Sequence, residues 1–163
     1  MPEPSDPGLW WRAFSRVVSI AWVSAASMRL ATIVDRPLMR LSGGRIRLSF
    51  VIPCLLLRCR GARTRRLYEV PLLYIADGEG VLLVGSGGGA EREPAWCSNL
   101  RAYPQVECLR RGFTQTLLAT ELSGTERLQA WKLAVAAYPG YQRYQSRVDR
   151  TIAVFRLRPT LEG

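Results

Sequence analysis

Residues 70–100, VPLLYIADGEGVLLVGSGGGAEREPAWCSNL, decide the fold because they combine two strands, a tight turn, a glycine loop and the start of a helix. The β-forming residues 72–75 end at 77–80 (DGEG), a strong hairpin signal, and residues 81–84 form the return strand. Pro94 suits a first helical turn, because its missing N–H would have no partner there anyway. The stretch therefore predicts an antiparallel hairpin that leads through a glycine loop into a short helix.

The loop Ser86-Gly87-Gly88-Gly89 lets the backbone approach a partner closely, because glycine has no Cβ and tolerates positive φ. A glycine loop before a helix offers unpaired N–H groups and the positive end of a helix dipole. This geometry suits an anionic or carbonyl-rich ligand. The alternative is a flexible connection, because the loop has neither the Gly-Lys-Ser/Thr ending of a triphosphate loop nor the G-x-G-x-x-G spacing.

Composition predicts one compact domain with an extension. The chain has 163 residues, of which 48% are hydrophobic, and a formal net charge of +10. Such a charge can serve nucleic acid, an anionic membrane surface or an anionic cofactor. Nothing in the sequence resembles a DNA-reading helix or an aromatic RNA-binding sheet motif, so nucleic acid is the least favoured partner.

The absence of histidine excludes several chemistries. Ser-His-Asp catalysis, Cys-His catalysis and histidine-ligated metals all require this residue. The four cysteines form no C-x-x-C pair and are flanked by apolar residues. This pattern is typical of buried free thiols in a reducing cytosol, so we expect a cytoplasmic protein with no metal site.

The N-terminal part divides into a disordered start, residues 1–8, and an amphipathic helix, residues 9–34. Arg12, Arg16 and Arg29 leave too short an uncharged run for a membrane span, which needs about 20 apolar residues. With tryptophan and phenylalanine on one side and arginine on the other, the helix suits the inner, anionic face of the cell membrane as a peripheral contact. Equally, it could pack across the barrel or against a second subunit.

Residues 35–163 form the predicted domain. We expect strands at 50–59 and 68–76, a hairpin of 105–110 with 114–121, and a last strand at 151–157. Ser123 and Glu126 form a capping-box pattern for a helix that ends at Tyr138-Pro139-Gly140, and a short polar helix follows at 141–149. The links between strands are too short for parallel crossovers, so the order favours a small antiparallel barrel.

Four segments in this order resemble the deazaflavin-dependent nitroreductase and quinone reductase family. They are RLSGGR at 40–45, the basic turn before VPLLY at 70–74, SGGGAEREPAWCSNL at 86–100, and YPGYQRYQSRVDR at 138–150. The resemblance implies a mainly β chain with helices (α+β), an antiparallel split β-barrel like that of flavin-mononucleotide-binding oxidases. It also implies hydride transfer from reduced 8-hydroxy-5-deazaflavin (coenzyme F-420), or less readily flavin mononucleotide, to a quinone or nitroaromatic acceptor.

The resemblance also implies the site residues. It places the catalytic role on Ser86, Tyr138, Tyr141 and Tyr144. It places cofactor binding on the basic turn, the glycine loop and their neighbours: Arg63, Thr64, Arg65, Arg66, Pro71, Ser86, Gly87, Gly88, Gly89, Trp96 and Asn99. The basic turn departs from the family pattern, since Ala62 replaces a basic residue, Arg65 a glycine and Tyr68 an arginine.

Each of these assignments has a structural alternative. The arginines could be a solvated turn, Trp96 a core residue, and the tyrosines an aromatic stripe that packs a helix on the barrel. Asp149 and Arg150 match a family D-R pair, which we interpret as a structural ion pair. A non-catalytic binder of deazaflavin or flavin mononucleotide is the alternative function, and the oligomer is either a monomer or a homodimer.

Overall fold

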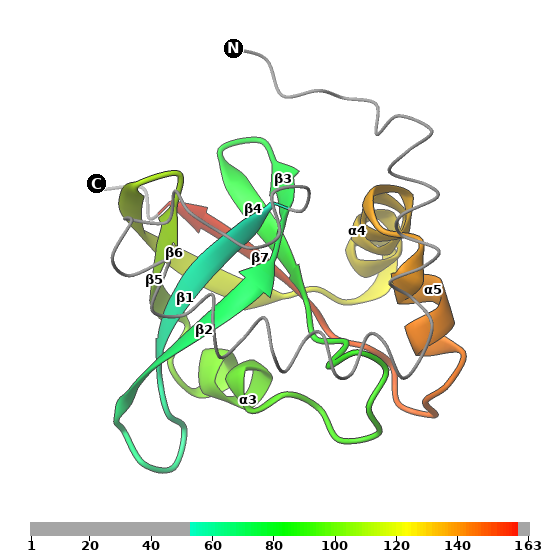
Figure 1. Ribbon diagram of the computed structural model, residues 1–163, viewed down its shortest axis with the longest axis horizontal. Coiled ribbons are helices and arrows are strands. Elements are labelled where there is room, and N and C mark those ends of the chain that lie inside the picture. The colour runs from blue at the N-terminus through cyan, green and yellow to red at the C-terminus, as the bar shows by residue number, and fades with distance from the viewer. Residues whose placement is uncertain (1–52, 160–163) are drawn as a thin grey trace.

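The computed structural model describes residues 53–159 (Figure 1). They form seven strands: β1 Cys54–Arg60, β2 Leu67–Leu73, β3 Ile75–Asp77, β4 Gly80–Val84, β5 Gln105–Arg110, β6 Phe113–Glu121 and β7 Val154–Pro159. Three helices accompany them: α3 Ala95–Ala102, α4 Gly124–Ala137 and α5 Gly140–Gln145. The predicted start at 1–8 and helix at 9–34, with its membrane contact, lie outside the described residues. Within residues 53–159, no helix has the length and apolar character to cross a membrane.

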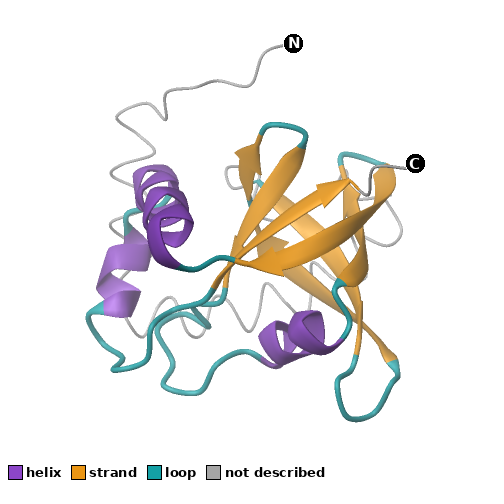
Figure 2. Cartoon of the chain, turned by 180° about the vertical axis from the view of Figure 1, so that it is seen from behind, coloured by secondary structure: helices purple, strands orange, loops and turns teal. Residues whose placement is uncertain are grey.

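The strands form one sheet in the order β2-β1-β5-β6-β7-β4-β3, and each neighbouring pair is antiparallel. The sheet curls on itself, as Figures 1 and 2 show, so the predicted antiparallel barrel is confirmed. The hairpin at residues 77–80 is also confirmed, since Asp77 pairs with Gly80 and Gly78 has a φ of 63°. Left-handed backbone of this kind favours glycine.

The predicted strand at 68–76 is two strands, not one. The chain leaves β2 after Leu73, and Tyr74 donates its backbone N–H to the carbonyl of Pro53 at 3.1 Å. β3 then pairs with β4 at the opposite edge of the sheet. The side chain of Tyr74 is buried in the barrel core, so this single residue carries the chain from one edge to the other.

The barrel interior follows the two-residue period of its strands. Leu55, Leu57 and Cys59 of β1 point into the main core, whereas Leu56 contacts Leu109 in a separate small cluster. α3 adds its apolar face to the same core through three buried side chains, Trp96, Cys97 and Leu100. α3 is thereby fixed against the sheet by burial of apolar surface.

α4 and α5 pack together beside the sheet, away from α3 (Figure 2). They share a cluster with Val84 and Ile152, and α4 contributes Ala134 to it. α5 is shorter than the predicted polar helix at 141–149, and it is not polar, because it buries Tyr141 and Tyr144. The apolar contact with α4 explains why these two aromatic positions face inward.

Two local predictions were wrong at the ends of these elements. Ser123 is the N-cap of α4, but its side chain makes no capping hydrogen bond, and Glu126 accepts a hydrogen bond from Arg156 at 3.4 Å. The capping box is therefore replaced by a contact with β7. β7 itself begins at Val154, because the N–H of Ile152 is bonded to the side chain of Gln145.

Gly85 joins β4 to the glycine loop at a crowded point. A methyl group there would lie 2.6 Å from the Sγ of Cys97. We expect Gly85→Ala to lower the free energy of unfolding by about 1–3 kcal/mol, the usual cost of overpacking a core. Thermal or urea denaturation measures this change. The penalty should shrink in a Cys97→Ala background, and an equal penalty in both backgrounds would contradict the proposed contact.

Candidate functional site

The glycine loop forms a tight turn directly after β4. The N–H of Gly89 donates to the carbonyl of Ser86 at 3.0 Å, and Gly87 and Gly88 between them have φ values of 58° and 69°. Positive φ at both central positions requires residues such as glycine. Within residues 53–159, the N–H groups of Gly87 and Gly88 have no hydrogen-bond acceptor. Two free backbone donors therefore stand next to each other in this turn, as the sequence predicted.

One side of the turn rests on α5. A methyl group at Gly89 would lie 3.2 Å from the Cδ1 of Tyr144. Glycine is needed here both for its φ of 81° and for this close approach. The glycine turn and the Tyr144 side chain of α5 are therefore packed directly against each other.

Arg150 holds the turn from the connection between α5 and β7. Its guanidinium donates to the carbonyl oxygens of Gly85, Ser86 and Ala90 at 3.0–3.1 Å. The predicted ion pair with Asp149 was wrong, because Asp149 is exposed and no ion pair joins the two within the described part of the chain. Sequence reasoning singled out the D-R pair but missed the contact with the glycine turn, because its partners are backbone carbonyls 60–65 residues away.

A second arginine fixes the β4–α3 connection at the end that precedes α3. Arg101 of α3 donates to both carboxylate oxygens of Glu93 at 2.6 and 2.9 Å, and to those of Glu121 in β6 at 2.6 and 2.7 Å. The hydrogen bonds with Glu121 and Glu93 raise the pKa of Arg101, and the hydrogen bond with Arg101 lowers the pKa of Glu121. The loop from β4 to α3 is thus fastened at both ends.

The basic turn between β1 and β2 is compact. The N–H of Gly61 donates to the carbonyl of Arg66 at 2.8 Å, and that of Arg65 donates to the carbonyl of Gly61 at 2.9 Å. Arg65 has a φ of 60°, a left-handed conformation that costs a non-glycine residue about 1–2 kcal/mol. The residue type that the family places here, glycine, adopts this conformation without that cost.

The arginines of this turn have no carboxylate partner among residues 53–159. Arg63, Thr64, Arg65 and Arg66 are all exposed. No carboxylate of residues 53–159 forms an ion pair with any of the three arginines. The Thr64 hydroxyl lies 3.0 Å from the hydroxyl of Tyr68, so Tyr68 braces the turn. Three positive charges within four residues, unpaired within the described part of the chain, are a candidate site for an anionic group.

Asn99 connects this basic turn to α3. Its Oδ1 accepts the N–H of Ala62 at 2.8 Å, and its Nδ2 donates to the Sγ of Cys59 at 3.7 Å. Asn99 is buried, so its side chain holds the basic turn in a fixed position relative to α3. As Figure 1 shows, the basic turn, α3 and the loop after β4 lie along one side of the molecule.

Two predicted cofactor residues occupy structural positions. Trp96 is only 5% exposed, and its ring lies 5.6 Å from that of Phe155, which is the core packing that we gave as the alternative. Pro71 lies in the edge strand β2 opposite Leu56, where a missing N–H costs no hydrogen bond. For these two residues, the geometry gives no support for contact with a ligand.

The three predicted catalytic tyrosines form one buried cluster. Tyr138, Tyr141 and Tyr144 are 2–7% exposed, with ring centroids 5.2–6.3 Å apart. The hydroxyls of Tyr138 and Tyr144 lie 3.1 Å apart in hydrogen-bond contact. Burial raises the pKa of Tyr138 and of Tyr141 above the usual value, so both phenols stay protonated and act only as neutral donors.

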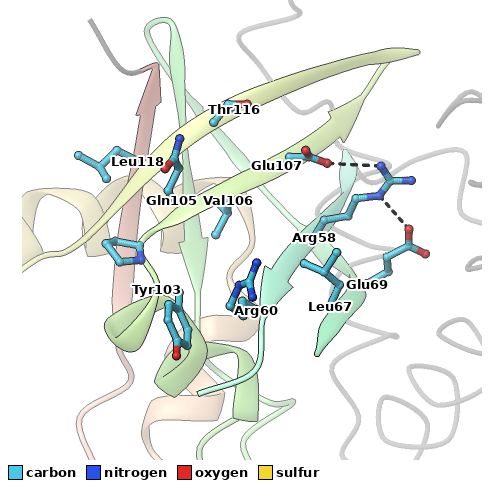
Figure 3. Close-up of a pocket in the computed structure, with 11 residues that line it drawn as sticks. Arg58, Arg60, Leu67, Glu69, Tyr103, Gln105, Val106, Glu107, Thr116 and Leu118 are labelled. Atoms are coloured by element: carbon cyan, nitrogen blue, oxygen red, sulfur yellow. Dashed lines mark hydrogen bonds and ion pairs between the residues drawn. The ribbon is translucent and has the colours of Figure 1, made fainter. Parts of the chain in front are cut away.

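A separate groove of about 870 Å³ lies over β1, β2, β5 and β6 (Figure 3). Its charges are largely balanced, because Arg58 pairs with Glu69 at 2.8 Å and with Glu107 at 3.4 Å. None of the predicted site residues lines it. We therefore place the candidate site at the glycine turn and the basic turn, where positive charge and backbone donors are free.

Comparisons with known proteins identify the family of the chain. The F420H(2)-dependent quinone reductase family matches residues 30–159. A Mycobacterium tuberculosis protein named F420H(2)-dependent quinone reductase is 34% identical over 86 residues, which are 51% of this chain and 58% of that relative. The chain thus spans little more than half of that relative's length.

Two solved structures are also similar. One, titled as an F420-H2 dependent reductase (FDR-A), is 37% identical, with a TM-score of 0.60 over 64% of this chain and 93% of the other. Another, titled as a domain-swapped dimer, is 32% identical, with a TM-score of 0.63 over 77% of this chain and 96% of the other. Because the family match covers most of the chain, including both turns, the protein belongs to the F420H(2)-dependent quinone reductase family.

Proposed function

We propose that the protein transfers a hydride from reduced deazaflavin coenzyme F-420 to a quinone or a related nitroaromatic acceptor. The main observation behind this proposal is that α3 connects the basic turn to the glycine turn. With respect to the described residues, one turn presents three arginines without a carboxylate partner, and the other presents two backbone N–H groups without an acceptor. A relative named as a quinone reductase and the family match support the same reaction.

The residues present fit a deazaflavin. Its phosphodiester and glutamate tail are anionic. Arg63, Arg65 and Arg66 are exposed beside the Thr64 hydroxyl, and no carboxylate of residues 53–159 pairs with them. Ser86 and the amides of Gly87 and Gly88 would face the ring system, whose carbonyl oxygens accept hydrogen bonds. When bound, the reduced cofactor supplies the hydride, and the protein supplies orientation and hydrogen-bond donors.

The proposed reaction requires little acid–base catalysis by the protein's own side chains. The sequence contains no histidine, and burial keeps the phenols of Tyr138 and Tyr141 protonated. A neutral phenol can donate a hydrogen bond to an acceptor oxygen and stabilise the charge that develops there. We propose this role for the tyrosine cluster together with Ser86, although the cluster must open slightly to admit an acceptor oxygen.

A non-catalytic carrier of deazaflavin or flavin mononucleotide is the second candidate. The burial of the three tyrosines favours it, and the hydroxyls of Tyr138 and Tyr144 contact each other within the cluster. The relative titled as a domain-swapped dimer supports a homodimer rather than a monomer as the assembly.

The first prediction concerns the cofactor. Fluorescence titration of reduced and oxidised deazaflavin into the full chain should give micromolar or tighter binding, on the order of −8 kcal/mol. Flavin mononucleotide, which lacks the long anionic tail, should bind more weakly. Tight deazaflavin binding with no reduction of quinones or nitroaromatics would identify the carrier, and the absence of deazaflavin binding would overturn the proposed enzyme.

The second prediction separates acceptor chemistry from packing. Tyr141→Phe should lower turnover with a soluble quinone about fivefold to tenfold, the equivalent of about one lost hydrogen bond, with little change in deazaflavin affinity. Steady-state kinetics and the titration above measure both quantities. Tyr103→Phe, at a tyrosine in the separate groove, is the matched control. Equal losses in turnover and cofactor affinity for Tyr141→Phe would mean that Tyr141 only packs.

The third prediction uses the backbone of Arg65. Arg65→Gly removes the cost of a left-handed φ, so the free energy of unfolding should rise by up to about 1 kcal/mol. If Arg65 binds the anionic tail, deazaflavin affinity should fall in the same variant. Arg111→Gly, at the other non-glycine residue with positive φ in residues 53–159, is the control and should keep the deazaflavin affinity of the wild type. Unchanged affinity in Arg65→Gly would remove Arg65 from the site.

A further inference from the structure

Arg150 ties the two sides of the glycine turn together. Its Nη2 donates to the carbonyls of Gly85 and Ser86, each at 3.1 Å, and to that of Ala90 at 3.0 Å, while its Nε reaches the Ala90 carbonyl at 3.2 Å. Gly85 and Ser86 enter the turn, and Ala90 leaves it. One planar guanidinium therefore fixes the start of the turn against its end.

The backbone of Arg150 is itself held by α5. The side-chain Nε2 of Gln145 donates to the carbonyl of Arg150 at 2.8 Å, and its Oε1 accepts the N–H of Ile152 at 2.9 Å. Tyr144, the preceding residue of α5, supports Gly89. Both supports of the turn thus come from the same short helix and the connection that follows it.

The charge of Arg150 remains available at the turn. Its partners are neutral carbonyl dipoles, and within residues 53–159 no carboxylate pairs with it. Its Nη1 is buried without a hydrogen-bond partner among the described residues. A guanidinium keeps its charge at any physiological pH. A fixed positive charge behind free backbone N–H groups favours an electronegative ligand atom.

We propose that Arg150 is a positioning residue of this site. It holds the carbonyls of Gly85, Ser86 and Ala90 in one arrangement, which keeps the amides of Gly87 and Gly88 free for an oxygen or nitrogen of the ligand. That atom belongs either to the deazaflavin ring or to the quinone or nitro acceptor. The proposal rests on the hydride-transfer function given above.

Two substitutions test the role. Arg150→Met removes the charge and all four hydrogen bonds, whereas Arg150→Lys keeps the charge but not the fork. We expect Arg150→Met to weaken ligand binding about tenfold or more, and Arg150→Lys to lie between it and the wild type. Arg147→Met, at an exposed arginine of the same connection, is the matched control and should bind as the wild type does.

The two possible ligands give different results. A rise in the Kd of reduced deazaflavin, measured by fluorescence, assigns the turn to the cofactor ring. A rise in the KM of menadione with an unchanged deazaflavin Kd assigns it to the acceptor. Added guanidinium ion at low millimolar concentration should partly restore binding to Arg150→Met, which a purely structural defect would not allow.

The wild-type protein provides a test that does not depend on a variant that folds. Hydrogen exchange at the Gly87 and Gly88 amides should slow when the ligand in question binds. Exchange unaffected by both ligands, or a folded Arg150→Lys with wild-type Kd and KM, would overturn the proposal. These outcomes differ from a failure of the proposed function, in which the wild type itself would not bind deazaflavin.

Discussion

The packing of α3 into the curled sheet is the constraint on which both turns of the candidate site depend. Trp96, Cys97 and Leu100 are buried in the barrel core, and full burial of a large apolar side chain contributes about 1.5–3 kcal/mol. Because these three anchor the helix, the fourth buried residue, Asn99, meets the N–H of Ala62 in the basic turn at a fixed position. The connection from β4 to α3, which contains the glycine turn and ends at the first residue of α3, is fixed by the same packing.

This arrangement explains why the arginines near the candidate site have no carboxylate partner within residues 53–159. Arg58, Arg101 and Arg156 each contact two carboxylates and serve to join strands, loops and helices. The more exposed of these pairs add little stability individually, but together the pairs occupy six carboxylates of residues 53–159. Within residues 53–159, the arginines of the basic turn and Arg150 therefore have no carboxylate partner.

Sequence patterns predicted the parts of the fold that depend on local rules. The hairpin at 77–80, the β5–β6 hairpin, the helix with Trp96 and Asn99, and the glycine turn all follow from turn residues and alternation. Tertiary contacts decided the rest. Tyr74 divides a continuous β-forming run because its ring enters the core, and Ser123 loses its capping role because Glu126 contacts Arg156. The sequence identified Arg150 as a motif residue, but no residue spacing could predict that its side chain binds backbone carbonyls.

The aromatic cluster shows how one set of residues can serve packing and chemistry together. Tyr144 supports Gly89 from below, and its hydroxyl meets that of Tyr138, so the shape of the glycine turn and the hydrogen bonding of the phenols are mechanically linked. A ligand atom that binds the amides of Gly87 and Gly88 would press on the same unit. Because Arg150 and Tyr144 both reach the turn from α5 and the residues after it, any opening of the cluster to admit an acceptor would also change the turn. Binding at the turn and access to the tyrosines therefore both depend on the same packing of α5 and of the connection to β7.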